Sequence, residues 1–261
     1  MNNRPLIIFA AGSLKTAFRE LLVQFEELHD VSVRSHFGPA GLLAKKIQQG
    51  AYVDLFASAN EAHPDSLVEY RTMAPGKVFA TNKLCVFTRP ELNVNQENLI
   101  ARLADPNIVV STSTPISDPG GDYALQVFEK IEALHPGIGV AIKHKAQHLL
   151  GGSIPAFSTT NPAHMPAAAR LIMDRRSDIH LGYASHTQTM SNLPGISIVP
   201  LPSAYQITAH YKYALNKNIT PAAVALADFL LSPAGQAHLV KNGFGYASAS
   251  TPADETDSVI N

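Results

Sequence analysis

Three turns built from small residues are the parts of this 261-residue chain whose spacing could do chemistry. They are Gly12-Ser13, Gly38-Pro39-Ala40-Gly41 and Pro119-Gly120-Gly121. Each follows a run that predicts a β-strand and precedes a run with helical spacing. A helix that starts at a strand end has unpaired backbone N–H groups, and its dipole favours an anion there. If the turns face one crevice, their N–H groups would hold an oxyanion without arginine or lysine. Ordinary strand-to-helix connections use the same turns, so that alternative stays open.

Two side chains could add hydroxyl donors to such a crevice. Ser13 stands where the N-cap of a helix would stand, ahead of an apolar helical face. Tyr183 lies near the end of the short apolar run 179–184, where a phenol can donate to an anion. Each also has a simpler interpretation, Ser13 as a helix cap alone and Tyr183 as a core aromatic residue. The residues of that helical face are Leu14, Phe18, Leu21, Leu22 and Phe25.

Catalysis and metal binding have weaker support in the sequence. Ser13 lacks the G-x-S-x-G setting of a hydrolase nucleophile, and no particular histidine is marked as its base. Asp118 and Asp122 could form an acid–base pair, although capping of the following helix explains them more simply. His144 and His148 have the i, i+4 spacing of a metal-binding pair, if they lie on a helix. No third ligand accompanies them, which favours surface histidines.

Composition narrows the class of partner. Hydrophobic residues make up 46% of the chain and charged residues 16%, with a net charge of −1, as in soluble globular proteins. The chain has no basic stripe, which argues against nucleic acid as a partner, and no apolar run of about 18 residues that would span a membrane. Its single cysteine, Cys85, excludes an internal disulfide. The start MNNRPLIIF lacks the apolar segment of a signal peptide, so the protein is either cytoplasmic or has lost its signal.

Strands and helices alternate around the turns. Three strand–turn–helix units in the first 60 or so residues predict a parallel sheet with helical crossovers. Ligands of such sheets bind outside the carboxyl ends of the strands. The chain has no low-complexity linker, so we expect two lobes that are joined by direct crossings of the chain. One lobe would comprise 1–80 and 206–261, and the other 81–205. We also expect a polar tail from residue 248. Further strands are predicted at 31–35, 54–59, 83–88, 107–111, 179–184, 196–199 and 206–215, and helices at 42–47, 123–134, 167–176, 221–231 and 233–240.

On these motifs the chain resembles the periplasmic molybdate-binding proteins of ABC transporters, which are type II solute-binding proteins. The resemblance covers nearly the whole chain up to about residue 245. It implies an α/β fold of two lobes, each a mainly parallel sheet flanked by helices, with the ligand in the cleft between them. The segments that carry it are FAAGSL at 9–14, FGPAGLLAKKI at 37–47, GAYVDLFASA at 50–59, PGGDYA at 119–124, LGYAS at 181–185 and ADFLLSPAGQ at 227–236.

The resemblance also implies a function. It is the capture of a tetrahedral oxyanion, molybdate or tungstate, for delivery to the membrane permease of an ABC transporter. The implied protein is a periplasmic monomer whose signal peptide has been removed; it is not an enzyme and carries no cofactor besides its ligand. Its ligand donors fall on Ser13, Ala40, Gly120, Tyr183 and a backbone group near His164 and Met165.

Two departures from the family bear on the ligand. The second loop of the family carries serines, whereas Gly38-Pro39-Ala40-Gly41 has no hydroxyl and its proline has no N–H. A lost side-chain bond to a charged ligand costs roughly 1.5–3 kcal/mol, or about one to two decades of affinity. The carboxylate of Asp118 would repel a dianion unless it points away or coordinates the metal centre, as a carboxylate does in tungstate-binding relatives. The alternative is the same fold with a different small polar or organic anionic solute.

Overall fold

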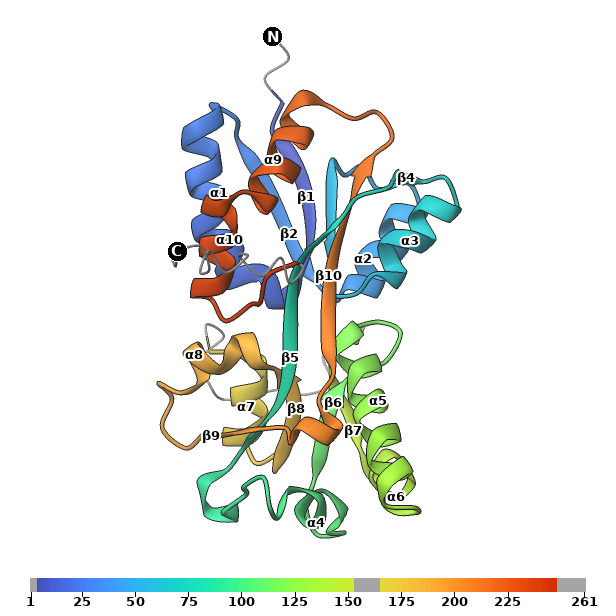
Figure 1. Cartoon of the computed structure of the whole chain (residues 1–261), viewed down its shortest axis with the longest axis vertical. Helices are drawn as coiled ribbons and strands as arrows, with labels where there is room; N and C mark the ends of the chain where they lie inside the picture. The colour runs from blue at the N-terminus through green and yellow to red at the C-terminus, as the bar shows by residue number, and fades with distance from the viewer. Residues whose placement is uncertain (1–3, 153–164, 248–261) are drawn as a thin grey trace, which may run out of the picture.

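Two long antiparallel strands join the two halves of the molecule. The computed structural model describes residues 4–152 and 165–247. Strands β5 (Val78–Thr88) and β10 (Thr208–Asn216) pair with each other and run from one half into the other (Figure 1). The predicted two-lobed α/β fold is therefore confirmed, and both crossings are extended strands.

The first half, here called lobe I, is built on β1 (Leu6–Ala11). This strand pairs in parallel with β2 (Val33–Gly38) and β3 (Leu55–Ser58), and β10 then pairs antiparallel with β3. Its sequence LIIFAA is wholly apolar because helices cover both faces of the sheet (Figure 1). The other elements are α1 (Lys15–His29), α2 (Ala40–Gln48), α3 (Ala62–Glu69), β4 (Met73–Ala74), α9 (Pro221–Leu231) and α10 (Pro233–Lys241).

The second half, lobe II, repeats the plan around β6 (Val110–Ser113). It pairs in parallel with β7 (Gln147–Leu150) and β8 (Ile179–Tyr183), and β5 pairs antiparallel with β8 and with β9 (Ser197–Pro200). Helices flank this sheet as well (Figure 1). They are α4 (Leu99–Ala104), α5 (Pro119–Leu134), α6 (Ile138–Lys145), α7 (Ala167–Met173) and α8 (Thr187–Met190), with short 3₁₀ turns at Pro90–Leu92, Ala184–His186 and Ser203–Tyr205.

Separate hydrophobic cores support the two lobes. The largest buried cluster joins β1 and α1 to the returning helices, for example through Phe25 and Phe229, whose ring centroids lie 5.7 Å apart. A second cluster lies in lobe II, and a small third one holds Cys85, Phe87 and Met190. Tyr183 is a lobe II residue that packs with the lobe I cluster. The side chain at the end of β8 therefore lies at the contact between the lobes.

Most predicted elements are present, with shifted bounds. Strand β5 begins at Val78 and not at 83, because Val78–Lys83 finds its partner in β10 despite weak apolar alternation. The short elements α4, α6, α8, β4 and β7 were not predicted. The expected tail from 248 lies outside the described residues. In the part that is described, no single helix is long and apolar enough to cross a membrane. Only α9 and α10 together, which are bent by 60° at the break between them, have the length and composition of a membrane span.

Candidate functional site

Ser13 lies in a 3₁₀ turn, Gly12–Leu14, between β1 and α1. The prediction that its side chain caps the helix is wrong, because this extra turn moves the start of α1 to Lys15 and makes Leu14 its N-cap. The Ser13 hydroxyl is instead hydrogen-bonded to the Tyr211 hydroxyl on β10 at 2.8 Å. The side chain is partly exposed and Gly12 is exposed, so the serine is open on one side.

A buried asparagine continues this hydrogen bond across the crossing strands. Asn82 on β5 is 3% exposed, and its Nδ2 donates to Tyr211 at 3.3 Å and to the Ser185 hydroxyl at 2.9 Å. Its Oδ1 accepts from the backbone N–H groups of Lys83 and Ser185 at 2.9 and 3.2 Å. Sequence reasoning missed Asn82 and Tyr211 as site residues. Tyr211 falls in the strand predicted at 206–215, whereas Asn82 lies just before the strand predicted at 83–88, so the local pattern did not indicate that its amide is buried.

Tyr183 ends β8 with its hydroxyl buried and without a hydrogen-bond partner among the described residues. The residue is 6% exposed, and its ring contacts those of Tyr211 and Tyr123 edge-on, at centroid distances of 6.0 and 6.5 Å. Burial, then the nearby Tyr211, raises the pKa of the Tyr183 phenol well above its ordinary value. The phenol therefore stays protonated and can donate.

Gly120 and Asp118 begin α5 directly against Tyr183. A Cβ atom at Gly120 would lie 3.3 Å from Cε2 of Tyr183, so the two predicted site residues are in contact. Asp118 is the N-cap of α5, as the simpler interpretation predicted, and accepts the Gly120 N–H at 3.0 Å. The amide predicted to donate to a ligand is therefore bonded to this carboxylate. Burial raises the pKa of Asp118, and the bonds from Gly120 and Ser113 partly offset the rise.

The turn Gly38-Pro39-Ala40-Gly41 contacts lobe II through its backbone. Ala40 begins α2 and is 1% exposed, and Gly41 donates its N–H to the carbonyl of Ser117 in lobe II at 2.9 Å. A Cβ atom at Gly41 would lie 2.1 Å from the carbonyl oxygen of Ile116. Ile116 has a φ of 68°, a left-handed conformation that β-branched residues rarely adopt. The loop before α5 thus covers the N-terminus of α2.

Residues 6–245 match the family model of bacterial extracellular solute-binding proteins. The chain belongs to this family. An uncharacterised protein of Pasteurella multocida is 37% identical to this solute-binding protein over 239 residues, which are 91% of this chain and 97% of that protein. The molybdate-binding protein ModA of Escherichia coli is 28% identical over 135 residues, which are 49% of this chain and 52% of ModA.

Two solved structures show the same fold at lower identity. The periplasmic molybdate-binding protein of Azotobacter vinelandii has a TM-score of 0.71 and 20% identity, covering 92% of this chain and 98% of its own. The sulfate-binding protein SubI of Mycobacterium tuberculosis has a TM-score of 0.76 and 15% identity, covering 94% of this chain and 88% of SubI. At these identities the likeness concerns the fold alone.

The remaining predicted site residues of the solute-binding protein lie elsewhere or have other partners. Met165 is partly buried and packs against the small cluster of Cys85 and Phe87, while His164 lies outside the described residues. His144 is on α6 and His148 is on β7, so the pair does not share a helix. In the described ranges no group of three or more His, Cys, Asp or Glu residues could hold a metal.

The alternative that Ser13 is a hydrolase nucleophile finds no support in the structure. The hydroxyl of Ser13 is bonded to Tyr211, a phenol, and not to a histidine that could act as its base. The histidine partner that a serine nucleophile at position 13 would require is therefore not in contact with it within the part of the chain that is described.

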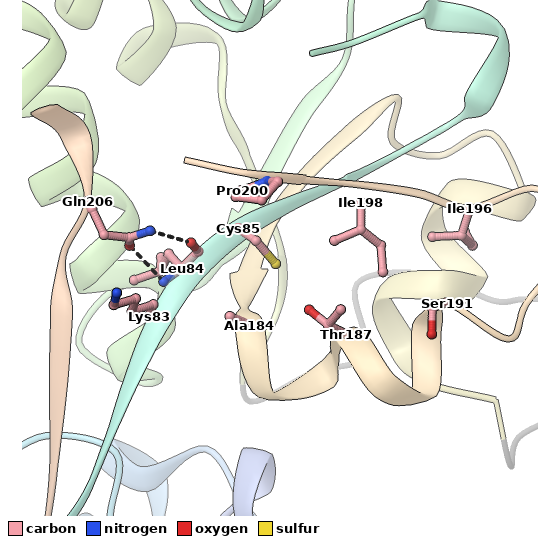
Figure 2. Close-up of a pocket in the computed structure, with 10 residues that line it drawn as sticks. All are labelled: Lys83, Leu84, Cys85, Ala184, Thr187, Ser191, Ile196, Ile198, Pro200 and Gln206. Atoms are coloured by element: carbon pink, nitrogen blue, oxygen red, sulfur yellow. Dashed lines mark hydrogen bonds between the residues drawn. The ribbon is translucent and has the colours of Figure 1, made fainter. Parts of the chain in front are cut away.

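Two pockets lie near the predicted ligand donors without being lined by them. One of about 350 Å³ lies between the lobes and is lined by residues that include Glu61, Asp122, Tyr123 and His210. The other, of about 490 Å³, lies in lobe II beside Cys85, where burial raises the pKa of the thiol to about 12 (Figure 2). Figure 2 also shows the Gln206 amide bonded to both backbone groups of Leu84. Ser13, Ala40, Gly120 and Tyr183 line neither of these two pockets.

Proposed function

We propose that this solute-binding protein captures a tetrahedral oxyanion, molybdate or tungstate, between its lobes and delivers it to the permease of an ABC transporter. The observation that carries the proposal is the Tyr183 hydroxyl, a buried donor without a protein partner in the described residues. Such a group costs about 1–3 kcal/mol unless it is satisfied, and an anion would satisfy it. The molybdate-binding relatives support this choice of ligand.

The proposed donors come from both lobes. Lobe I would contribute the Ser13 hydroxyl and the Ala40 N–H, and lobe II the Tyr183 hydroxyl and the backbone at Gly120 and Met165. Because the ligand would contact both lobes, it would favour the state in which they are closed. At Gly120 the ligand would have to replace the Asp118 carboxylate as the acceptor.

The lobe bounds, location and assembly belong to the same proposal. We divide the chain into 1–80 plus 206–261 and 81–205, because the main hydrophobic clusters separate near these positions. A periplasmic location of a monomer fits the family of extracellular solute-binding proteins. Delivery to a permease requires release from a cleft that can open about β5 and β10.

The chemistry of the donors favours a fully deprotonated anion. Hydroxyl and N–H groups that donate match molybdate, tungstate or sulfate, whereas a protonated phosphate needs an acceptor as well. Asp118 is the acidic residue beside the proposed donors. It would either repel the dianion, contact the metal centre of the oxyanion, or accept a proton from another ligand.

A second candidate is a small organic anion. The pocket of about 350 Å³ adjoins Pro119 and Tyr123, at the start of the same helix as Gly120. It offers space for an organic group whose anionic end contacts Tyr183. The serine-free turn at Ala40 is consistent with such a ligand.

Calorimetry on ligand-stripped protein with molybdate, tungstate, sulfate and phosphate tests the proposal. We expect binding of molybdate or tungstate, together with a rise in the thermal unfolding midpoint. No response to either metal oxyanion would overturn the ligand assignment. Native mass spectrometry of freshly purified protein covers the second candidate, since a carried organic anion would have a distinct mass.

A further inference from the structure

A chain of hydrogen bonds runs from Asn82 through Tyr211 to Ser13. We propose that Tyr211, oriented by Asn82, holds the Ser13 hydroxyl as a hydrogen-bond donor toward the oxyanion. This inference rests on the proposed function and deepens it. It adds two positioning residues, one on each crossing strand, that would make the site select deprotonated oxyanions.

The backbone sets the orientation of the Asn82 amide. The N–H groups of Lys83 and Ser185 can only donate, and they lie 2.9 and 3.2 Å from Oδ1 of Asn82. That atom must therefore be the oxygen, which resolves the usual ambiguity of an amide. The nitrogen Nδ2 then faces Tyr211 and Ser185, and it can only donate to their hydroxyls.

The direction of the Tyr211 hydroxyl follows from this orientation. Tyr211 is fully buried and accepts from Asn82 at 3.3 Å, and its hydroxyl lies 2.8 Å from that of Ser13. If Ser13 were the donor, the phenol would accept two hydrogen bonds. Its own buried proton would then have no acceptor in hydrogen-bonding geometry among the described residues, since the neighbouring Tyr183 hydroxyl makes no such bond. That loss costs about 1–3 kcal/mol, so Tyr211 donates to Ser13. Burial also raises the pKa of Tyr211, which keeps the phenol protonated.

The geometry of the crossing strands presents Tyr211 to Ser13. The pairing of β5 with β10 shifts register between Tyr211 and Lys212, and such bulges re-aim neighbouring side chains. Asn82 also bonds Ser185, two residues after Tyr183, so the same amide connects both proposed hydroxyl sites. The direction of the Ser13 hydroxyl in lobe I is thus determined by residues on the two strands that join the lobes.

The consequence concerns the single proton of Ser13. Because that proton is not used on Tyr211, it can point to the open side of the serine. Ser13 then presents a proton where a ligand oxygen would lie. A deprotonated oxyanion accepts this bond, whereas a protonated oxygen at the same place would oppose it.

A double-mutant cycle with molybdate tests the relay by calorimetry. Tyr211→Phe should weaken binding about fivefold, and Ser13→Ala at least about tenfold. In the Ser13→Ala background, Tyr211→Phe should cause no further loss, because the relay acts only through Ser13. An equal loss in both backgrounds would overturn the inference and leave the proposed function intact. Tyr205→Phe is the matched control, since it removes a phenol that is bonded to His135 at 2.7 Å in lobe II.

A measurement without ligand separates this inference from the proposed function. The Raman doublet of tyrosine reports whether a phenol donates or accepts its main hydrogen bond. The difference between wild type and Tyr211→Phe should show a donating phenol, and an accepting one would overturn the relay. If the wild type binds neither molybdate nor tungstate, the proposed function fails while the Raman result still decides the direction of the bond.

Discussion

Gly41 of lobe I donates its backbone N–H to the carbonyl oxygen of Ser117 in lobe II at 2.9 Å. The bond joins the N-terminus of α2 to the loop before α5, beside the turn that holds Ala40. The backbones approach so closely that a Cβ atom at position 41 would lie 2.1 Å from the oxygen of Ile116. Glycine at this position therefore permits the contact between the lobes.

Gly41→Ala should prevent this contact and weaken ligand binding. Alanine suits a helix better than glycine, so α2 itself should keep its stability. The closed state would lose its close backbone contact, and we expect molybdate affinity to fall at least about tenfold. Calorimetry and the radius of gyration with and without molybdate measure both effects. Gly38→Ala is the matched control, since its Cβ would contact only the Leu43 side chain, at 3.8 Å; equal affinities of the two variants would contradict the prediction.

Tyr183→Phe should separate binding from stability. The hydroxyl has no protein partner among the described residues, so its removal should leave the thermal unfolding midpoint unchanged or raise it. Affinity for molybdate should fall by about one to two decades, because the ligand loses a buried donor. Chemical denaturation and calorimetry on the same preparation give both values. A clear loss of stability with unchanged affinity would show that the hydroxyl has a structural role.

Asp118→Asn should strengthen the binding of a dianion. The asparagine oxygen can still accept the Gly120 N–H, so the helix cap is kept, while a negative charge beside Tyr183 is removed. Binding of sulfate, which remains a dianion, should also strengthen in the wild type as the pH is lowered, because burial raises the pKa of Asp118 and its carboxyl becomes neutral at a higher pH than an ordinary aspartate. In the variant this pH dependence should be absent. Weaker tungstate binding by the variant would instead indicate that the carboxylate contacts the metal centre.

His180 should make the fold sensitive to acid. The side chain is 2% exposed, its Nδ1 lies 2.8 Å from the Ser111 hydroxyl, and burial lowers its pKa to about 3. Since the unfolded state binds a proton near pH 6.5 and the folded state does not, stability is full above that pH and falls as the pH drops toward about 3. At pH 5 the loss should be about 2 kcal/mol.

Urea denaturation at pH 7.5 and pH 5 measures this effect. His180→Asn should have a smaller difference between the two pH values than the wild type. His144→Asn, at an exposed position on α6, should retain the wild-type difference. Identical pH differences in wild type and His180→Asn would rule out this histidine as the cause.

The local pattern was sufficient for the alternation of strands and helices. Apolar runs such as 6–11 and the small residues that follow them depend only on near neighbours in the sequence. The order of strand, turn and helix can therefore be predicted from the sequence. Gly120 and Tyr183 were singled out by the small-residue turn and the strand end and then assigned as donors by resemblance, and the structure brings them into contact. The expected cap at Ser13 failed because a 3₁₀ turn, which the sequence does not distinguish from α-helix, precedes α1.

The partners across the lobes depend on contacts between distant parts of the chain. Ser13 and Tyr211 are 198 residues apart, and Asn82 and Tyr211 are 129 apart. Local hydrophobic periodicity places each of these residues on a strand or turn, but their meeting depends on how β5 pairs with β10 and where its register shifts. The order of strands, turns and helices is therefore a property of the sequence, while the direction of the Ser13 proton and the closure at Gly41 arise from strand pairing and backbone approach in the folded protein.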